Sequence, residues 1–446
     1  MKLRLALDIQ SEAVIAFTGA GGKTSALVTL GRELAADGWR VLATTTTRLG
    51  ADQIALFPTA CHQAFSGAAL AEALEQHRFA FYYTALRDGK AHGIAPEQLV
   101  DLMREAEADV VLVEADGARR KPLKAPYSHE PVIPAETTRI VQVAGFRAFQ
   151  QPLTDAHVYN ARALAEMAGV PLGSPITPDV FARALTIGSD EPHTAHLPIN
   201  GLINPIDADD TTARASAGQI AALALRMSRL ERVLIGAVQA DDPIHELHRR
   251  VSAIVPAAGL SRRMGQPKPL LPWGDGVIIE QVVRTLRAAG VDDVIVITGA
   301  QAEAVRTAAQ RAGARCVHNP DYAEGDMLSS LQIGLQALEP TVSAALIALA
   351  DQPLMRKLNV QRILLAYAEG RGRIVAPSHQ MRRGHPILID RRYWGDLLAL
   401  PPGSAPRDAI NRHADAITYV DCDETILLDV DTPDAYADAL RRAGLG

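Results

Sequence analysis

Residues 254–268 read IVPAAGLSRRMGQPK, and they follow an apolar stretch that begins at Val251. The pattern predicts a short buried strand over 251–255 that ends in a loop of small residues. Small side chains let a ligand approach the backbone N–H groups of such a loop, and successive N–H groups in a turn bind anions. Arg263 and Lys268 would add positive charge for a polyphosphate. The stretch therefore predicts the nucleotide site of a transferase in the C-terminal half of the chain.

Length and composition indicate a soluble globular protein. The 446 residues favour about two or three domains. A hydrophobic content of 48% with 22% charged residues is ordinary for such proteins, and the net charge of −6 disfavours a nucleic-acid partner. No apolar run approaches the roughly 20 residues that span a membrane, and we find no signal peptide. Three widely spaced cysteines favour free thiols, so we expect a cytoplasmic protein without membrane contact.

A second glycine-rich stretch lies near the N-terminus. Residues 18–25 read TGAGGKTS, after a strand predicted at 14–17 and before an amphipathic helix that ends near Gly38. In such a loop the backbone N–H groups and the helix N-terminus hold phosphates, Lys23 reaches them and Thr24 meets Mg²⁺. The spacing is shorter than in the standard phosphate-binding loop and resembles that of the Mur ligases; the alternative is a tight turn with a surface lysine. The nucleotide-binding candidates are Gly19, Gly21, Gly22, Lys23, Thr24 and Ser25.

Two carboxylates follow an apolar strand in the same half. Residues 109–117 read DVVLVEADG, and Glu114 and Asp116 come at the end of the strand. Ligands bind at the carboxyl ends of strands in parallel sheets, so both are candidates for Mg²⁺ or for positioning water, with an acidic turn as the alternative. Strands alternate with helices here, which predicts a parallel sheet covered on both faces.

Four motifs, the glycine-rich stretch among them, support a family resemblance for the N-terminal half. GAGGKTS, TTTTR, VEADGARRKPLKAP and HEPVIP together resemble the selenium-dependent hydroxylase accessory protein family over residues 10–240. The resemblance implies a P-loop-like accessory domain that binds a nucleotide. Residues 200–207 (NGLINPID) also resemble the Asn-Lys-x-Asp motif with which GTPases read guanine, but Pro205 replaces the lysine, so the match does not predict GTP.

The C-terminal half repeats the alternating pattern after a polar stretch. Residues 241–250 are charged and contain one proline, which predicts a linker between domains 1–240 and 251–446. We expect strands at 251–255, 293–298, 314–318, 344–349, 373–376 and 386–389, and two short ones within 416–430. We expect helices at 277–289, 301–312, 327–338, 357–369, 390–399, 405–413 and 433–443.

Three carboxylates at the ends of predicted elements fit nucleotidyl transfer. Asp351 follows the apolar strand 344–349, and Asp429 and Asp431 precede a helix start at Thr432. Mg²⁺ is commonly held by one or two carboxylates together with phosphates and water. Asp429 and Asp431 stand two apart on an extended segment, so both face one side and packing decides which of them reaches the metal.

Six motifs of this half, taken in order, resemble the MobA-like nucleotidyltransferases, closest to the molybdenum cofactor cytidylyltransferase branch. They are PAAGLSRRMGQPKPLLPW with the helix after it, HNPDYAEGDMLSSL, ALADQPL, RRGHPILI and DVDTPDAY. The resemblance implies a Rossmann-like domain with a mixed sheet, in which Arg263, Lys268 and Asp351 act in catalysis and Asp351, Asp431 and Asp429 serve Mg²⁺. It further implies that Ala257, Ala258 and Gly259 contact the nucleotide, and that Asn319, Ser329, Gly384 and His385 line the acceptor pocket.

The alanine pair of the loop bears on the choice of base. The guanylyl branch has a sequence like Ala-Gly-Gly at this place, whereas this loop has Ala257-Ala258-Gly259. The extra methyl group narrows the base pocket. It would favour binding of a pyrimidine over a purine by about 1–3 kcal/mol. Pro256 stands where the family has leucine and removes one backbone donor. We therefore expect transfer of CMP from CTP to molybdenum-molybdopterin, with the N-terminal domain assisting a molybdenum hydroxylase. The alternatives are another NTP, a sugar-phosphate or isoprenoid acceptor, or a cofactor-binding chaperone.

Overall fold

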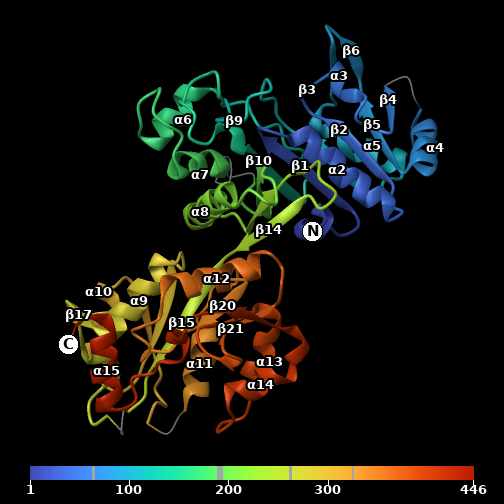
Figure 1. Cartoon of the computed structure of the whole chain (residues 1–446). Helices are drawn as coiled ribbons and strands as arrows, with labels where there is room; N and C mark the ends of the chain where they lie inside the picture. Colours follow the sequence, from blue (N-terminus) through green and yellow to red (C-terminus); the bar gives the residue numbers. More distant parts are fainter. Residues whose placement is uncertain (63–65, 188–193, 261–263, 324–325, 446) are drawn as a thin grey trace. The chain divides into compact units, whose positions relative to one another are not determined.

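The chain divides into two compact units. The computed structural model describes residues 1–62, 66–187, 194–260, 264–323 and 326–445. One unit comprises Met1–His248 and the other Arg249–Gly446. Figure 1 shows that each unit contains its own central sheet with helices packed against it. Each unit therefore has its own core and its own candidate site.

The first unit is built on a nine-stranded sheet in the order β14-β13-β12-β10-β1-β8-β2-β5-β4. The pairs that flank β1 and continue outward to β13 and β4 are parallel. Parallel strands need crossover connections, and the intervening helices provide them. The strands are β1 Ala13–Gly19, β2 Val41–Thr45, β4 Thr59–His62, β5 Phe79–Tyr83, β8 Val110–Glu114, β10 Arg139–Gly145, β12 Ile199–Asn204, β13 Arg232–Gly236 and β14 Ile244–Arg249.

Helices cover both faces of this sheet, as β1 illustrates. Ile15 and Phe17 pack in one core with α1 and α2, whereas Ala16 packs in another with α6, α7 and α8. Successive side chains of a strand point to opposite faces, so a strand that is apolar throughout is buried on both sides. The helices are α1 Leu3–Leu7, α2 Lys23–Ala36, α3 Ala51–Ile54, α4 Gly67–His77, α5 Leu99–Ala106, α6 Ala161–Ala168, α7 Pro178–Thr186 and α8 Thr211–Met227. A small three-stranded sheet has the order β3 Arg48–Gly50, β7 Lys90–His92 and β6 Ala85–Arg87. A two-stranded sheet pairs β9 Leu123–Lys124 with β11 Val158–Tyr159.

The predicted linker is wrong for most of its length. Residues 244–249 form β14, the edge strand next to β13. Glu246 is buried at 1% exposure, and its carboxylate accepts hydrogen bonds from Arg214 at 2.6 Å and pairs with His248 at 2.7 Å. The polar composition suggested an exposed segment because a sequence does not reveal partners that satisfy a buried carboxylate.

The second unit has a mixed sheet, as expected. Its order is β19-β18-β15-β20-β23-β21-β22, with β24 paired to β21. β15 runs parallel to β18 and β20, whereas β23 runs antiparallel to β20 and β21. The strands are β15 Val251–Ala257, β16 Pro272–Trp273, β17 Gly276–Val277, β18 Asp293–Thr298, β19 Arg315–His318, β20 Ala344–Ile347, β21 Ile374–His379, β22 Arg382–Arg383, β23 Ile387–Asp390 and β24 Ile417–Asp421.

The predicted elements of this half agree with the structure except near its end. The helices are α9 Ile278–Ala288, α10 Ala302–Arg311, α11 Met327–Gln336, α12 Lys357–Ala368, α13 Trp394–Leu398, α14 Pro406–Arg412 and α15 Pro433–Ala443. Two short strands within 416–430 were expected, but only β24 forms there, and a 3-10 helix at Glu424–Leu427 follows it. Asp423 caps that turn by accepting the N–H of Thr425 at 3.0 Å, which favours a helical turn over a strand.

The approach of α11 to β15 depends on a glycine, and it gives a first prediction. A Cβ on Gly334 would lie 2.5 Å from Cγ2 of Ile254. Gly334→Ala is therefore expected to push α11 away from the sheet and to lower the free energy of unfolding by about 1–3 kcal/mol. Gly395 in α13 has no atom within 4 Å of such a Cβ, so Gly395→Ala is expected to stabilise the helix by up to about 1 kcal/mol. Denaturant titrations of both variants test the contrast, and equal losses would contradict it.

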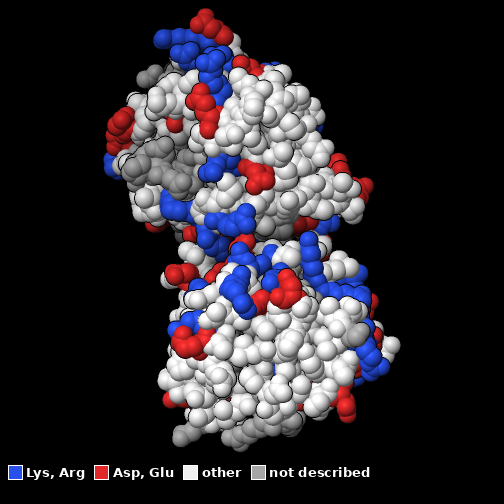
Figure 2. All heavy atoms as spheres, turned by 90° about the vertical axis from the view of Figure 1, so that its left-hand side faces the viewer, with Lys and Arg blue, Asp and Glu red and all other residues white. Residues whose placement is uncertain are grey.

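Charged side chains of both signs lie on the face that Figure 2 presents. Figure 2 shows Lys and Arg interspersed with Asp and Glu on the face that it presents. Among the described residues, we find no helix with the length and apolar character needed to traverse a bilayer.

Candidate active site and nucleotide pocket

In the second unit, a lysine and two aspartates from three separate segments meet at the carboxyl end of the sheet. Lys268 begins a 3-10 turn after the loop that follows β15, and its ammonium donates to Oδ2 of Asp351 at 3.0 Å and also to Oδ1 of Asp431. Asp351 follows β20, and its backbone carbonyl accepts the N–H of Val430 at 2.9 Å. The fold therefore brings Lys268 into contact with Asp351, 83 residues later in the sequence, and with Asp431, 163 residues later.

The charges in this cluster depend on one another. Burial disfavours the charge on Lys268, but hydrogen bonds and attraction to Asp431 and Asp351 outweigh burial and raise the pKa of the lysine. Asp429 lies beside the pair and accepts a hydrogen bond from Nε2 of Gln352 at 2.7 Å. Burial, together with repulsion from Asp351 and Asp431, raises the pKa of Asp429. The site thus concentrates negative charge around one ammonium group.

The residues expected to line the acceptor pocket fall into two local arrangements. Asn319 is fully buried, and its Nδ2 donates to Oγ of Ser329 at 3.1 Å and to Oγ of Ser330 at 3.0 Å. A Cβ on Gly384 would lie 2.3 Å from the carbonyl oxygen of Ile426, to which the N–H of His385 donates at 3.2 Å. Asn319 therefore positions Ser329, and close backbone packing fixes Gly384 and His385.

In the first unit, the glycine-rich loop connects β1 to α2. Lys23 is the first residue of α2, and Gly21 and Gly22 have φ angles of +83° and +126°. A Cβ on Gly21 would lie 2.3 Å from Cα of Gly145, and one on Gly22 would lie 2.5 Å from Nδ2 of Asn204. Only glycine fits such backbone at such close approach, so the loop amides are held open at the N-terminus of a helix.

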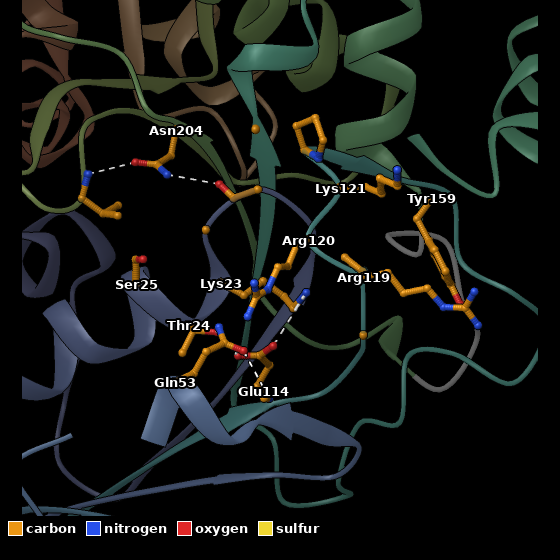
Figure 3. Close-up of a pocket in the computed structure, with 18 of the residues that line it drawn as sticks. Lys23, Thr24, Ser25, Gln53, Glu114, Arg119, Arg120, Lys121, Tyr159 and Asn204 are labelled. Carbon is orange, nitrogen blue, oxygen red and sulfur yellow. Dashed lines mark hydrogen bonds and ion pairs between the residues drawn. The ribbon is translucent and has the colours of Figure 1, made fainter. Parts of the chain in front are cut away.

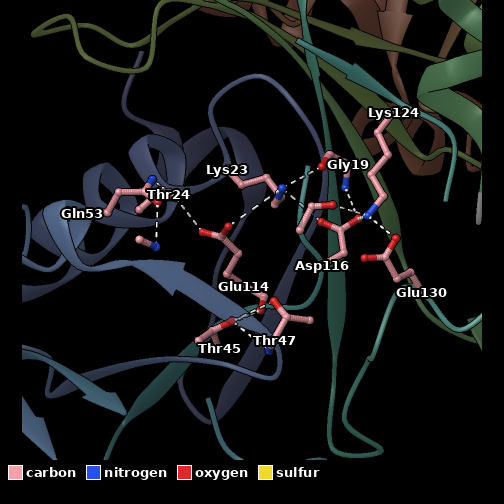
Figure 4. Close-up of polar contacts among 12 residues, drawn as sticks. Gly19, Lys23, Thr24, Thr45, Thr47, Gln53, Glu114, Asp116, Lys124 and Glu130 are labelled. Carbon is pink, nitrogen blue, oxygen red and sulfur yellow. Dashed lines mark hydrogen bonds and ion pairs between the residues drawn. The ribbon is translucent and has the colours of Figure 1, made fainter. Parts of the chain in front are cut away.

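Lys23, Thr24 and Glu114 form the centre of this site (Figure 4). The hydroxyl of Thr24 donates to Oε2 of Glu114 at 2.7 Å and accepts from Nε2 of Gln53 at 3.0 Å. The Lys23 ammonium donates to the carbonyl of Gly19 at 2.7 Å and lies 3.9 Å from Glu114 Oε1. Burial lowers the pKa of Lys23, but the neighbouring carboxylates outweigh it and raise that pKa overall. A hydroxyl paired with a carboxylate beside a charged lysine suits a phosphate-bound divalent cation.

Asp116 contacts the backbone and the lysines around the glycine-rich loop. Its side chain is 2% exposed, and its Oδ2 accepts the N–H of Gly19 at 2.9 Å. It pairs with Lys23 and with Lys124, both at 3.1 Å, and Lys124 pairs in turn with Glu130 at 2.9 Å. Asp116 thus anchors the loop and Lys23, and it lines a separate small cavity with Thr18 (Figure 4).

A large pocket of about 1660 Å³ surrounds the glycine-rich loop. Figure 3 shows Lys23 and Thr24 between Asn204 on one side and Arg119, Lys121 and Tyr159 on the other. Arg119 and Arg120 adopt left-handed backbone with φ of 46° and 60°. Such strain is common where side chains are directed at a ligand. Besides the loop, the lining residues include Arg119, Arg120, Lys121, Arg147, Tyr159, Asn204, Pro205, Asp207, Val238 and Gln239.

Comparisons with known proteins find a different family in each of the two units of the chain. The model of the YqeC protein family matches residues 15–162, and that of the MobA-like NTP transferase domain matches residues 253–442. The chain belongs to both families. It joins a YqeC domain to a MobA-like NTP transferase domain, and it is a nucleotidyltransferase.

Three relatives each match about two fifths of the chain. The YqeC domain is 34% identical over 186 residues to the uncharacterized protein YqeC of Escherichia coli, covering 39% of this chain and 67% of that protein. The transferase domain is 32% identical over 190 residues to nicotine blue oxidoreductase of Paenarthrobacter nicotinovorans, covering 41% of this chain and 92% of that protein. It is 28% identical over 193 residues to molybdenum cofactor cytidylyltransferase of Escherichia coli, covering 43% of this chain and 96% of that protein.

Some of the predicted site residues contact one another in each domain. In the transferase domain, Lys268 joins Asp351 and Asp431, with Asp429 beside them, whereas Arg263 lies outside the described residues. The methyl of Ala258 lies against Gly299, where an added Cβ would come within 2.7 Å of it. Among the described residues, no three or more His, Cys, Asp or Glu side chains gather as a metal site, so each carboxylate pair would need phosphate or water to complete a cation's shell.

Sequence reasoning missed several residues that position these groups. Gln53 and Gln352 orient Thr24 and Asp429, and Lys124 with Glu130 completes the network around Asp116. Lys124 and Glu130 do lie in the Pro-rich segment 118–134. A composition unlike that of a helix or strand was therefore the available signal, but long-range partners are not visible in sequence.

The half-buried side chain of His385 in the transferase domain gives a prediction about pH. Burial, together with repulsion from Arg383, lowers the pKa of His385 from its ordinary value of 6.5 to about 4. The folded state keeps His385 neutral while the unfolded chain takes up a proton, so stability falls as pH decreases from 6.5 to 4, by up to about 3 kcal/mol. We expect His385→Gln to show a smaller loss over this range in denaturant titrations. An unchanged slope would contradict the assignment.

Proposed function

We propose that the MobA-like domain transfers CMP from CTP to the phosphate of molybdenum-molybdopterin, giving the cytosine dinucleotide cofactor and pyrophosphate. The observation that carries the proposal is the contact of Lys268 with both Asp351 and Asp431 at the end of the loop that follows β15. The name of one relative, molybdenum cofactor cytidylyltransferase, supports the choice of nucleotide and acceptor.

The chemistry follows from this cluster. An oxygen of the acceptor phosphate attacks the α-phosphorus of CTP, and a new P–O bond forms while the bond from that phosphorus to the bridging oxygen breaks. The electron pair leaves with pyrophosphate. Lys268, kept charged by its two carboxylate neighbours, would neutralise negative charge that develops on the triphosphate, and Arg263 would add to it.

A divalent cation held by the two carboxylates would take the place of the Lys268 ammonium. That ammonium lies between Asp351 and Asp431, so their oxygens attract positive charge and suit Mg²⁺, and once displaced Lys268 would face the triphosphate. Bound there, Mg²⁺ would neutralise and polarise the α-phosphate. Asp351 and Asp431 would hold it, and Asp429, held by Gln352, would add charge from the side.

The remaining predicted residues would bind the two substrates. Ala257, Ala258 and Gly259 would contact the nucleotide, with the Ala258 methyl favouring cytosine over a purine. Asn319 and Ser329, joined by a hydrogen bond, would line the acceptor pocket together with Gly384 and His385.

The YqeC domain, in our proposal, is P-loop-like and binds a nucleotide in its large pocket. Gly19, Gly21, Gly22 and Ser25 would contribute loop contacts, Lys23 would meet the phosphates, and Thr24 with Glu114 would hold Mg²⁺. Asp116 would position Lys23 rather than bind metal. The domain would assist maturation of a molybdenum hydroxylase in the cytoplasm.

The decisive measurement is pyrophosphate release by the full chain over a grid of four NTPs and several acceptors. We expect release with CTP and molybdenum-molybdopterin, and a product whose mass is that of the cytosine dinucleotide. Release only with sugar or isoprenoid phosphates, or with another NTP, would overturn the substrate assignment. Because one relative is named an oxidoreductase, consumption of a reduced nicotinamide is measured in parallel, and redox turnover without pyrophosphate would overturn the proposed transfer.

A further inference from the structure

One side of the YqeC-domain pocket is formed by the segments that follow β12 and β13. These strands are parallel neighbours, so their carboxyl ends meet at one edge of the sheet. Asn204 ends β12, and Pro205, Asp207 and residues 237–240 line the pocket beyond the two strands. These residues therefore line the same pocket as the glycine-rich loop.

Asn204 joins this side to the loop (Figure 3). Its Nδ2 donates to the carbonyl of Gly21 at 3.2 Å, and its Oδ1 accepts the N–H of Val238 at 2.9 Å. The side chain is buried at 5% exposure, and Gly22 leaves just enough space for it. Both ends of the amide thus contact the protein, so Asn204 ties the end of β12 to the glycine-rich loop and to Val238.

Asp207 differs from the other carboxylates of the pocket wall. Glu114 accepts from Thr24, Glu130 pairs with Lys124, and Asp52 pairs with Arg120. The Asp207 side chain is exposed, and among the described residues no side chain pairs with it. An exposed carboxylate on the wall of the pocket that contains the glycine-rich loop is suited to accept hydrogen bonds from the far end of a nucleotide.

We propose that the YqeC domain binds a guanine nucleotide and that Asp207 reads its base. A carboxylate accepts two parallel hydrogen bonds from adjacent N–H donors, which guanine presents at N1 and at its 2-amino group. Adenine and cytosine place a ring acceptor beside their amino group, and uracil flanks its N–H with carbonyls, so each would set a lone pair against the carboxylate. Pro205, which stands where the GTPase motif has lysine, offers a rigid apolar surface for the plane of the base. The inference rests on the proposed nucleotide site of this domain.

The test is binding of fluorescent GTP, ATP, CTP and XTP analogues to the full chain in the presence of Mg²⁺. Signal that is lost on Lys23→Ala belongs to the YqeC domain and is thereby separated from binding by the transferase domain. For that signal we expect GTP to bind at least about 100-fold tighter than ATP, because a mismatched polar edge leaves the carboxylate opposed by a lone pair.

Asp207→Asn gives the sharper readout. Xanthine carries a carbonyl where guanine has its 2-amino group, so the amide of asparagine matches xanthine and mismatches guanine. We expect preference to change from GTP to XTP in this variant, while Asp209→Asn, at a neighbouring exposed residue that does not line the pocket, keeps the preference for GTP.

The outcomes separate the inference from the proposal beneath it. Equal affinity for GTP and ATP, or an Asp207→Asn variant with unchanged preference, would overturn the reading of guanine while the nucleotide site itself would stand. If no nucleotide shows binding that depends on Lys23, the proposed nucleotide site fails, and the inference fails with it. A preference that changes to XTP supports both.

Discussion

Asp351→Asn is expected to lower kcat/KM for pyrophosphate release at least about 1000-fold, which corresponds to about 4 kcal/mol of lost transition-state stabilisation. Asparagine keeps the shape of the side chain, and the backbone carbonyl at position 351 still accepts the N–H of Val430. What the variant loses is the negative charge that faces Lys268 and that would hold Mg²⁺. CTP binding should persist at reduced affinity, because the loop after β15 remains intact.

A matched change on the surface provides the control for Asp351→Asn. Asp438 lies on α15 and pairs with Arg441 and Arg442 at the surface, so Asp438→Asn removes the same charge at a cost of about 0.5 kcal/mol or less. We expect this variant to turn over like the parent chain. Full activity of Asp351→Asn under Mg²⁺ would refute the metal assignment, and equal loss in both variants would point to overall charge rather than to the site.

The core elements of both domains could be predicted because their patterns are local. The strand that became β15 is apolar on both faces, with Ala253 and Val255 in one core and Ile254 in another. Such a strand is recognisable without its partners. The helix starts at Lys23 and at Pro433 also follow from local signals, a glycine turn in one and Thr432 with proline in the first turn in the other.

The order of the strands and the buried ion pairs could not be predicted in the same way. The position of Asp116 between Lys23 and Lys124 depends on a loop that returns to the sheet, and β14 depends on Arg214 satisfying Glu246. Each of these contacts joins residues that are distant in sequence, and a single sequence records the charges but not their pairing. The sequence therefore suggested which residues carry chemistry, while the structure distinguishes Glu114, beside Thr24, from Asp116, which supports the loop.

The segment 204–207 illustrates how a structure changes the meaning of a motif. On sequence alone, Pro205 argued against guanine because the motif requires lysine at that position. In the fold, the asparagine of the segment contacts the glycine-rich loop through Gly21, and the aspartate lines the same pocket. For guanine binding, the place of Asp207 in the pocket is a stronger argument than the absence of the motif's lysine at position 205. Hydrogen bonding to the base depends on the carboxylate and not on Pro205.

Gly21→Ala is expected to abolish nucleotide binding by the YqeC domain and to cost it about 2–4 kcal/mol of stability. The added methyl would lie 2.3 Å from Cα of Gly145, 2.4 Å from its nitrogen and 2.6 Å from the carbonyl oxygen of Pro122. All three are backbone atoms, so no side-chain rotation relieves the clash, and the loop must move away from β10. Because Asn204 is hydrogen-bonded to Gly21, the base side of the pocket would move with it.

Gly38→Ala separates this clash from the strain of left-handed backbone. Gly38 has a φ of +92°, close to the +83° of Gly21, but nothing lies within 4 Å of its added Cβ. This control should cost only about 1 kcal/mol and leave nucleotide binding unchanged. Hydrogen exchange of β1 and β10 measures the stability of the domain, and fluorescent GTP measures binding, while pyrophosphate release by the transferase domain reports that the rest of the chain is intact. If the hydrogen-exchange rates and the GTP affinity of Gly21→Ala equal those of Gly38→Ala, the close contact of Gly21 with β10 is not needed for nucleotide binding, and the prediction is wrong.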